Sequence, residues 1–450
     1  MNHFLKENLS FALLVISWVL VGVYGAGAIY LYIPLCIILM KRKGMLRELF
    51  LGLLIILVFS DNRHEGMRWA GNIKDIYIVS LSAFLFFERK SFPQFNTFYL
   101  KFIPFFLVAL FCILYSEEPL TSIEKTFSYL LILMVVPNYI SKLYDDYGDK
   151  FLEDLVWLAV TLLFSAVVLI FINPKVVYFY GRYSGILGNP NGLGIYTMLN
   201  FFLYSTILDI RPKMFTKNER SFIFLIIILT LFASGSRSSI LAVFIFSLFK
   251  YFYKMSPMLG FVVFLLISVS YQLITDNLKI IIEIFGLQSF FRLETVATGS
   301  GRIIAWTFAW QQIQKNLFFG KGFGYTDYVF DDNWVYLSRL GHQGNAHNSY
   351  LTMWLETGLV GLIFYFMALL SSFFAAIKKS RVTIPLIYAI LFQIFFESWL
   401  AASLNPYTIL LIIILVVISL PLKEETIDIA EEEEELPEFY PQRFVPQRAR

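Results

Sequence analysis

The segment GNAHNSYL contains His347, the residue whose type and setting point most directly to chemistry. Histidine is the only side chain that takes up and releases a proton near neutral pH without a large shift of its pKa, and the sequence has four histidines. The side-chain amides of Asn345 and Asn348 can donate or accept hydrogen bonds beside it. A lone histidine is more often structural, so other residues must decide whether His347 is a general base.

Arginines in segments of small residues add a second kind of chemistry, the binding of an anion. Arg237 lies in SGSRSS between two apolar runs, and Arg182 lies in YGRYSGILGNPNGLG. An arginine inside a membrane helix costs about 2.5–3.5 kcal/mol and usually marks a site, and its guanidinium can bind two phosphate oxygens at once. Arg182 is equally consistent with an interfacial arginine whose stem lies along apolar surface. Arg237 is predicted to bind an anion.

Arg302 follows a Ser/Gly turn and falls in the first turn of a predicted amphipathic helix. The apolar residues Ile303, Trp306, Phe308 and Trp310 predict that this helix lies along the membrane surface. A helix N-terminus favours acidic residues because of the helix dipole, so an arginine there opposes the local electrostatics. We therefore expect a bound anion at this position, held by the guanidinium and by free N–H groups.

These residues must be positioned by membrane helices. Of the 450 residues, 58% are hydrophobic and 15% are charged, whereas soluble domains carry about 25% charged residues. The sequence predicts an all-α, polytopic integral membrane protein with about 12–14 transmembrane helices, some of them shorter than a full crossing. Apolar runs lie near 9–24, 26–40, 49–60, 76–88, 99–115, 122–141, 154–173, 193–210, 220–233, 238–253, 257–274, 359–377, 383–400 and 406–420.

Several classes of site are disfavoured by the same sequence. The sequence lacks the basic stripe that a nucleic-acid-binding protein needs, and it lacks the Walker loop that would bind a nucleotide. Cys36 and Cys112 lie inside apolar runs, where a small core residue is the expected role. No Cys/His cluster has metal-ligand spacing. The predicted chemistry therefore needs neither metal nor cofactor.

The distribution of Lys and Arg orients the predicted helices. Four short loops are rich in these residues, and a fourteen-span arrangement puts all four on the same side as both termini: 41–48, 88–90, 211–220 and 378–381. Positive loops face the cytoplasm, so both termini are expected inside. The long loop with Arg302 and His347 is then expected outside.

The expected organisation has four parts. Residues 1–274 form transmembrane helices with short loops, and residues 275–358 form one large outer loop that carries the catalytic motifs. Residues 359–420 form the C-terminal transmembrane helices. Residues 421–450, with five consecutive glutamates, are expected to be a disordered acidic cytoplasmic tail.

The motifs together resemble the O-antigen ligase and O-antigen polymerase superfamily. His347 and Asn348 are followed after nine residues by Gly358 and Gly361, as in that family's His-Asn-X9-Gly-X-X-Gly pattern. Upstream, the segments GSRSS, GR…W and GKGFGY look like the shared core of the family. The resemblance covers roughly residues 180–362 by motif and the whole chain by hydropathy.

The resemblance implies a fold, a reaction and roles for single residues. Members have a GT-C-like helical architecture with a large periplasmic loop in the bacterial inner membrane. They transfer glycan from undecaprenyl diphosphate to an acceptor sugar without metal or cofactor. Arg237, Arg302 and His347 match the family's essential residues and are the predicted catalytic set. Substrate binding is assigned to Arg182, Asn345, Asn348 and Tyr325, the last from GKGFGY.

The acceptor is less well defined than the donor. A ligase passes the finished polymer to lipid A–core, and a polymerase adds repeat units to a growing chain; the motif spacing favours the ligase. A lipid-linked oligosaccharide flippase is a more remote alternative, since the distinctive charges gather at one face and not at the bilayer midplane. Membrane lipids are the remaining expected partners. The sequence does not define the sugars, the oligomeric state, the exact helix count or the role of the tail.

Overall fold

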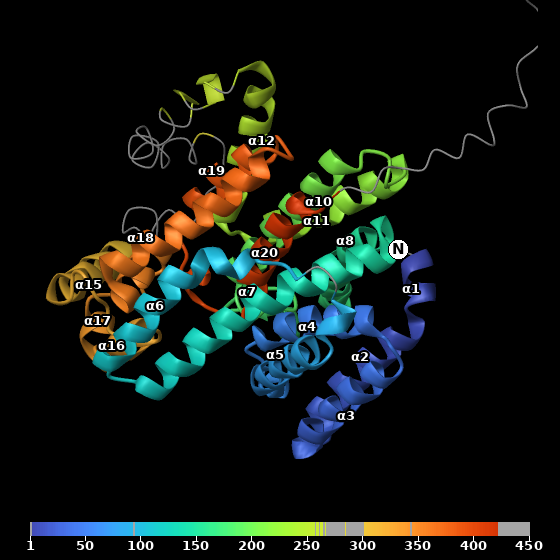
Figure 1. Cartoon of the computed structure of the whole chain (residues 1–450), viewed down its shortest axis with the longest axis horizontal. Helices are drawn as coiled ribbons and strands as arrows, with labels where there is room; N and C mark the ends of the chain where they lie inside the picture. Colours follow the sequence, from blue (N-terminus) through green and yellow to red (C-terminus); the bar gives the residue numbers. More distant parts are fainter. Residues whose placement is uncertain are drawn as a thin grey trace, which may run out of the picture. The chain divides into compact units, whose positions relative to one another are not determined.

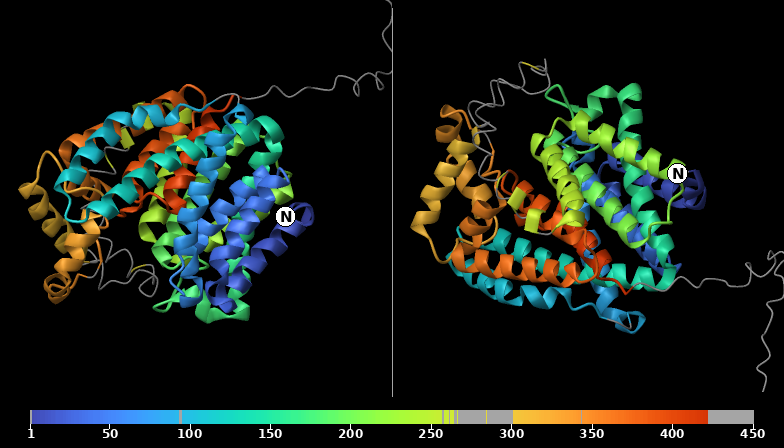
Figure 2. Two further views of the ribbon diagram at one scale, coloured as in Figure 1. Left: turned by 60° about the horizontal axis from the view of Figure 1, so that its bottom comes forward. Right: turned by 90° about the horizontal axis from the view of Figure 1, so that it is seen from above.

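The computed structural model describes residues 2–92, 95–256, 258–260, 262–263, 266, 284, 301–342 and 344–421. The predicted span 257–274, the start of the predicted outer loop and the acidic tail therefore lie largely or wholly outside the described residues. Residues 1–420 form one unit. Figures 1 and 2 show this unit as a bundle of helices.

The described chain is almost entirely helical, and this confirms the predicted all-α class. Its only sheet among these residues is a short hairpin in which Phe179 pairs with Arg182. The elements are α1 (Asn2–Glu7), α2 (Leu9–Tyr24), α3 (Ile29–Arg42), α4 (Leu46–Ser60), α5 (Trp69–Phe87), α6 (Ile103–Cys112), α7 (Pro119–Tyr147), α8 (Asp149–Ile172), α9 (Pro174–Val177), β1 (Tyr178–Phe179), β2 (Arg182–Tyr183), α10 (Pro190–Ile210), α11 (Lys217–Ser234), α12 (Arg237–Met255), α15 (Arg302–Lys315), α16 (Tyr325–Asp332), α17 (Trp334–Arg339), α18 (Ser349–Ile377), α19 (Thr383–Gln393) and α20 (Pro406–Ser419).

Many of these helices have the length and composition of membrane spans, so the chain is a multi-pass membrane protein. Within the described ranges, six helical stretches are long and apolar enough to cross a bilayer: 65–87, 98–115, 119–147, 149–172, 190–210 and 349–377. Shorter apolar helices include α2, α19 and α20. Figure 1 shows α20 in the middle of the bundle, and its residues from Pro406 to Ile418 are all buried.

Local sequence explains where several helices begin. Asn189, Asn348 and Asn405 each accept a backbone N–H of the following turn through the side chain, and so start α10, α18 and α20. Thr216 and Glu219 form a reciprocal capping box at the start of α11. Proline follows the cap in α10 and α20, where its missing N–H costs no hydrogen bond.

The four loops rich in Lys and Arg gather at one face, as their distribution predicted. Lys41 pairs with Glu88, which joins the first two loops. Arg47 and Arg211 bind the start of α8 at Asp154 and Asp149, at 2.9 and 2.7 Å. Asp209 accepts a hydrogen bond from Ser380 at 2.7 Å, and Lys379 donates to the carbonyl of Ser419. The N-terminus joins the same face, since Asn8 accepts from Arg47.

The helix α18 starts ten residues earlier than the predicted span at 359, so the loop predicted to end at 358 ends at Asn348. Glu356, Thr357 and Gly358 interrupt the apolar pattern. The pattern therefore predicted only the part of α18 that follows Gly358. The chain is helical on both sides of Gly358, which has φ 71° and ψ 179°, a conformation essentially restricted to glycine.

The break at Gly358 is filled by the segment Leu317–Gly322. The backbone N–H groups of Leu359 and Val360 donate to the carbonyls of Leu317 and Phe318 at 3.0 and 3.2 Å. In the reverse direction, the N–H of Gly322 donates to the carbonyl of Glu356 at 2.8 Å. A side chain on Gly358 would collide with the Phe318 backbone. Backbone groups freed from the helix are thus satisfied by protein, as a membrane protein requires.

Candidate functional site

The centre of the candidate site is Glu397, which lies in a break between α19 and α20. The predicted span 383–400 ends early, because α19 stops at Gln393 and the chain then turns irregular. Ser349, at the start of α18, holds this break in place. Its N–H donates to the carbonyl of Ile394 at 2.8 Å, and its hydroxyl donates to the carbonyl of Glu397 at 2.7 Å. The Glu397 side chain is 9% exposed.

Arg302 approaches Glu397 from the first turn of α15. Its Nη2 donates to Oε1 of Glu397 at 3.0 Å, and its guanidinium lies 5.7 Å from the ring centre of Phe396. The turn before it needs Gly301, whose φ is 74° and whose Cβ position is crowded by Gly341 and His342. In this structure, the anion at the N-terminus of α15 is therefore the carboxylate of Glu397, a group of the protein itself.

The orientation of α15 corrects one expectation. The helix packs on α18 and buries Ala305, Phe308, Ala309 and Ile313, which follow the spacing of one helix face. Ile303 and Trp310 are instead 61% and 41% exposed. Trp306 donates to the carbonyl of Ala346 at 3.0 Å. Hence α15 is a packed element that supports the His347 loop, and the predicted apolar face was only partly right.

His347 faces Glu397 from the other side. Its Nδ1 lies 3.6 Å from Oε2 of Glu397, and its side chain is 31% exposed. The distance is longer than a hydrogen bond, but contacts of catalytic groups often tighten only when substrate binds. A carboxylate at this position can orient the imidazole and stabilise its protonated form.

The backbone of His347 is held in an unfavourable conformation. Its φ is +45°, one of three positive values among described residues other than glycine, and such strain persists only where the surroundings impose it. Asn345 imposes it: its Oδ1 accepts from the N–H of His347 at 3.1 Å and from the hydroxyl of Ser398 at 3.3 Å. Backbone strain of this kind clusters at functional sites.

His342 also supports this loop. It is 3% exposed, its Nε2 lies 3.1 Å from the carbonyl of Asn345, and its ring centre lies 6.1 Å from that of His347. Burial, with the neighbouring His347, holds the pKa of His342 below its usual value. A neutral ring that carries its proton on Nε2 fits this contact. His342 lies in no motif, so no role for it was predicted from the sequence.

A second branch reaches Glu397 from α10 and the hairpin. Asn191 donates through Nδ2 to Oε1 of Glu397 at 3.0 Å, and its Oδ1 accepts from Arg182 at 3.3 Å. Arg182 also donates to the carbonyls of Ser234 and Gly235 at 3.0 and 3.3 Å. These carbonyls form the turn before Arg237, the first residue of α12. One polar network therefore joins the turn of Arg237 to Arg182, and through Glu397 to Arg302 and His347.

Two other predicted site residues have different surroundings. The side chain of Asn348 accepts from the N–H groups of Tyr350 and Leu351, so its Oδ1 caps α18. Tyr325 starts α16, is half-buried and contacts the ring of Tyr328. It lies in a second polar cluster in which Lys125 binds Asp327 at 2.8 Å and Lys321 binds Glu117 at 3.2 Å.

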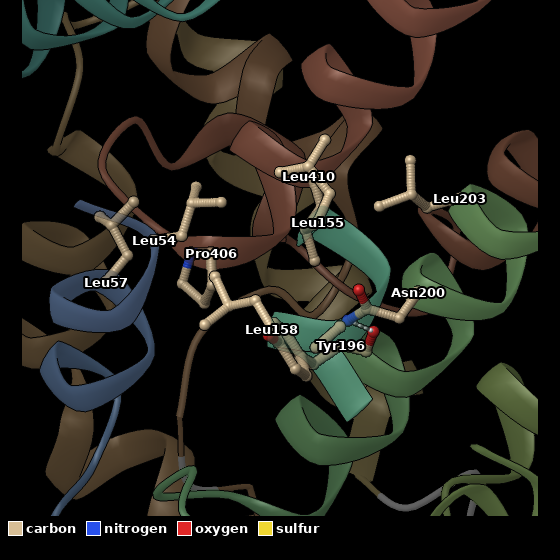
Figure 3. Close-up of a pocket in the computed structure, with 10 residues that line it drawn as sticks. Leu54, Leu57, Leu155, Leu158, Tyr196, Asn200, Leu203, Pro406 and Leu410 are labelled. Atoms are coloured by element: carbon tan, nitrogen blue, oxygen red, sulfur yellow. Dashed lines mark hydrogen bonds between the residues drawn. The ribbon is translucent and has the colours of Figure 1, made fainter. Parts of the chain in front are cut away.

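A pocket in the helical bundle has a different character. About 340 Å³ of space lies between α4, α8, α10 and α20, and Figure 3 shows its lining. That lining is apolar apart from Asn200 and Tyr196. It offers neither an arginine nor a histidine, so the Glu397 network is the candidate site.

Glu397 is a residue of the candidate site that the motifs missed. It is the only charged residue in the predicted span 383–400. A charge inside an apolar run is costly and by default marks a functional site. That signal could have singled out Glu397, although it could not have named the partners.

Comparison with known proteins supports the resemblance. A search of the curated proteins found no match. Residues 222–366 match the family model described as O-antigen ligase. The matched segment holds Arg237, Arg302 and His347, together with Gly358 and Gly361 of the glycine motif. The match over residues 222–366 therefore supports the O-antigen ligase superfamily as the family that this membrane protein resembles.

Proposed function

We propose that this protein transfers a glycan from undecaprenyl diphosphate to an acceptor sugar at the periplasmic face of the bacterial inner membrane. The observation that carries the proposal is the convergence on Glu397 of an arginine, Arg302, which can bind phosphate, and a histidine, His347, which can accept a proton. Cleaving a glycosyl diphosphate needs both functions side by side. The family domain supports the same class of reaction.

The proposed reaction is a single displacement. Arg237 and Arg302, with Arg182, hold the diphosphate and stabilise the negative charge that grows as the bond from the anomeric carbon to the phosphate oxygen breaks. His347 takes the proton of the acceptor hydroxyl as that oxygen attacks the anomeric carbon. Glu397 orients the imidazole and stabilises its positive charge. The anomeric centre is inverted, undecaprenyl diphosphate leaves, and no metal is required.

Ligation to lipid A–core is the reaction we favour, and polymerisation of repeat units is the second candidate. The two are distinguished by deleting the gene and examining the lipopolysaccharide. Loss of a ligase leaves core without O-antigen and accumulates lipid-linked polymer. Loss of a polymerase leaves core that bears a single repeat unit. Core without O-antigen, together with lipid-linked glycan that stays on the cytoplasmic side, would instead identify a flippase.

The diphosphate clamp predicts a specific effect of charge-conserving substitutions. Arg302→Lys and Arg237→Lys should each reduce transfer by about 10²-fold, because an ammonium cannot bind two phosphate oxygens as a guanidinium does. Arg339→Lys is the control, since Arg339 is exposed on α17. Transfer is measured with purified protein and a lipid-linked donor. Equal activity of all three variants would exclude the clamp.

The orientation of the site predicts a labelling pattern. Cysteine at position 331, on α16, should react with a membrane-impermeant maleimide in intact spheroplasts, because this loop is proposed to face the periplasm. Cysteine at position 432 should react only after the inner membrane is permeabilised. The reverse pattern would place the site on the cytoplasmic side and exclude this function.

A further inference from the structure

The loop that follows α4 contacts the Arg182 branch of the site. The carbonyl of Asp61 accepts from the N–H of Gly188 at 3.0 Å, and Nδ2 of Asn62 donates to the carbonyl of Ile186 at 2.8 Å. Any side chain at Gly188 would collide with Asp61 and Arg63. The turn that leads into α10 is thus fitted closely to this loop.

Arg63 extends the same contact to the hairpin. Its guanidinium lies 5.2 Å from the ring centre of Phe179, and Phe179 is paired with Arg182 across the two strands. Directly opposed residues of an antiparallel pair project from the same face of the sheet. Arg63 therefore packs on the residue beside Arg182.

The side chain of Asp61 completes the arrangement on the other flank. Its Oδ2 accepts from the hydroxyl of Tyr407, in the first turn of α20, at 2.9 Å. Gly192 lies against both groups, and a side chain there would collide with the Tyr407 hydroxyl. Gly192 follows Asn191, which donates to Glu397. Asp61 and Tyr407 thus fix the first turn of α10 directly beside Asn191, the residue that donates a hydrogen bond to Glu397.

We propose that Asp61 is a positioning residue for the transfer reaction. Through Tyr407 and the 186–192 turn, Asp61 holds Arg182 and Asn191 in position next to Glu397. This inference rests on the proposed function of the site. Asp61 touches none of the reacting groups in this arrangement. Its effect comes from alignment, and a polar site works only when its groups are held within about 0.5 Å of the productive geometry.

The test is a double-mutant cycle read out by binding of undecaprenyl diphosphate to the purified full-length protein. Asp61→Ala should raise Kd about tenfold, the size of one lost charge-assisted contact. In an Arg182→Ala background, Asp61→Ala should change Kd by less than about twofold, because its effect passes through Arg182. A residue that merely supports the fold would add its full effect in both backgrounds.

Asp209→Ala is the matched control. Asp209 lies at the opposite end of α10 and also accepts one hydroxyl hydrogen bond, from Ser380. It should leave Kd unchanged. If Asp61→Ala does not give folded protein by size exclusion, the cycle is run with Asn62→Ala, which removes the contact with Ile186 and the local hydrogen bond from the N–H of His64. Wild-type protein that fails to bind undecaprenyl diphosphate would overturn the proposed function. Normal affinity of the variants, or additive effects, would overturn the positioning role alone.

Discussion

Replacing His347 with alanine is expected to reduce glycan transfer by about 10²- to 10⁴-fold, the usual contribution of a general base. The imidazole is the proton acceptor of the proposed reaction and faces Glu397 at 3.6 Å. Binding of undecaprenyl diphosphate should change little, since His347 acts on the acceptor hydroxyl. The measurement is the single-turnover rate with purified protein, a lipid-linked donor and a saccharide acceptor. Chelation of metal ions should leave the wild-type rate unchanged.

The exposed His64 provides a matched control, because its alanine variant also removes an imidazole from the chain. His342 is unsuitable as a control, since its ring is buried and supports Asn345. A His347→Ala enzyme with near-normal turnover would rule out the proposed proton transfer. So would a wild-type enzyme that stops when metal is removed.

Replacing Glu397 with glutamine should reduce transfer by about 10²-fold or more. The substitution keeps the shape of the side chain and removes the charge that binds Arg302 and faces His347. Both neighbours then lose their shared counter-charge, and a partly buried arginine without a partner is costly. Because part of the effect of Glu397 passes through His347, the double variant Glu397→Gln/His347→Ala should be faster than the product of the two single effects predicts.

Glu65→Gln controls for the loss of a Glu–Arg pair. Glu65 binds Arg68 at 3.3 Å, but both side chains are more than three-quarters exposed. Exposed pairs contribute only about 0–1 kcal/mol, so this variant should be active. If Glu397→Gln retains full activity, the carboxylate is a structural partner of Arg302 and has no role in the reaction.

The sequence predicted the helical class and gathered candidate site residues because both kinds of signal are local. A run of apolar residues identifies a membrane helix wherever it packs, and an arginine among glycines and serines is unusual without reference to any neighbour. In the structure, one polar network joins three of the residues that were singled out in this way: Arg182, Arg302 and His347.

Contacts between distant segments were not predictable in the same way. Glu397 lies 50 residues after His347 and 95 after Arg302, and neither spacing follows a helical period. Asn348 is a second example. Its position directly after His347 suggested substrate binding, whereas the structure shows that its side chain caps α18. The end of α19 at Gln393 is a third, because apolar residues continue through the irregular segment.

The break at Gly358 also fixes how the protein matches the thickness of its bilayer. An unbroken α18 of 29 residues would be about 43 Å long, well beyond the roughly 30 Å of a hydrocarbon core. The part after the break, Leu359–Ile377, is about 28 Å long at 1.5 Å per residue. Hydrophobic matching therefore predicts that the membrane boundary lies at Gly358, where the backbone leaves the helical conformation. A thicker bilayer would itself have to thin next to this helix, since the hydrogen bonds to Leu317 and Phe318 prevent the helix from lengthening.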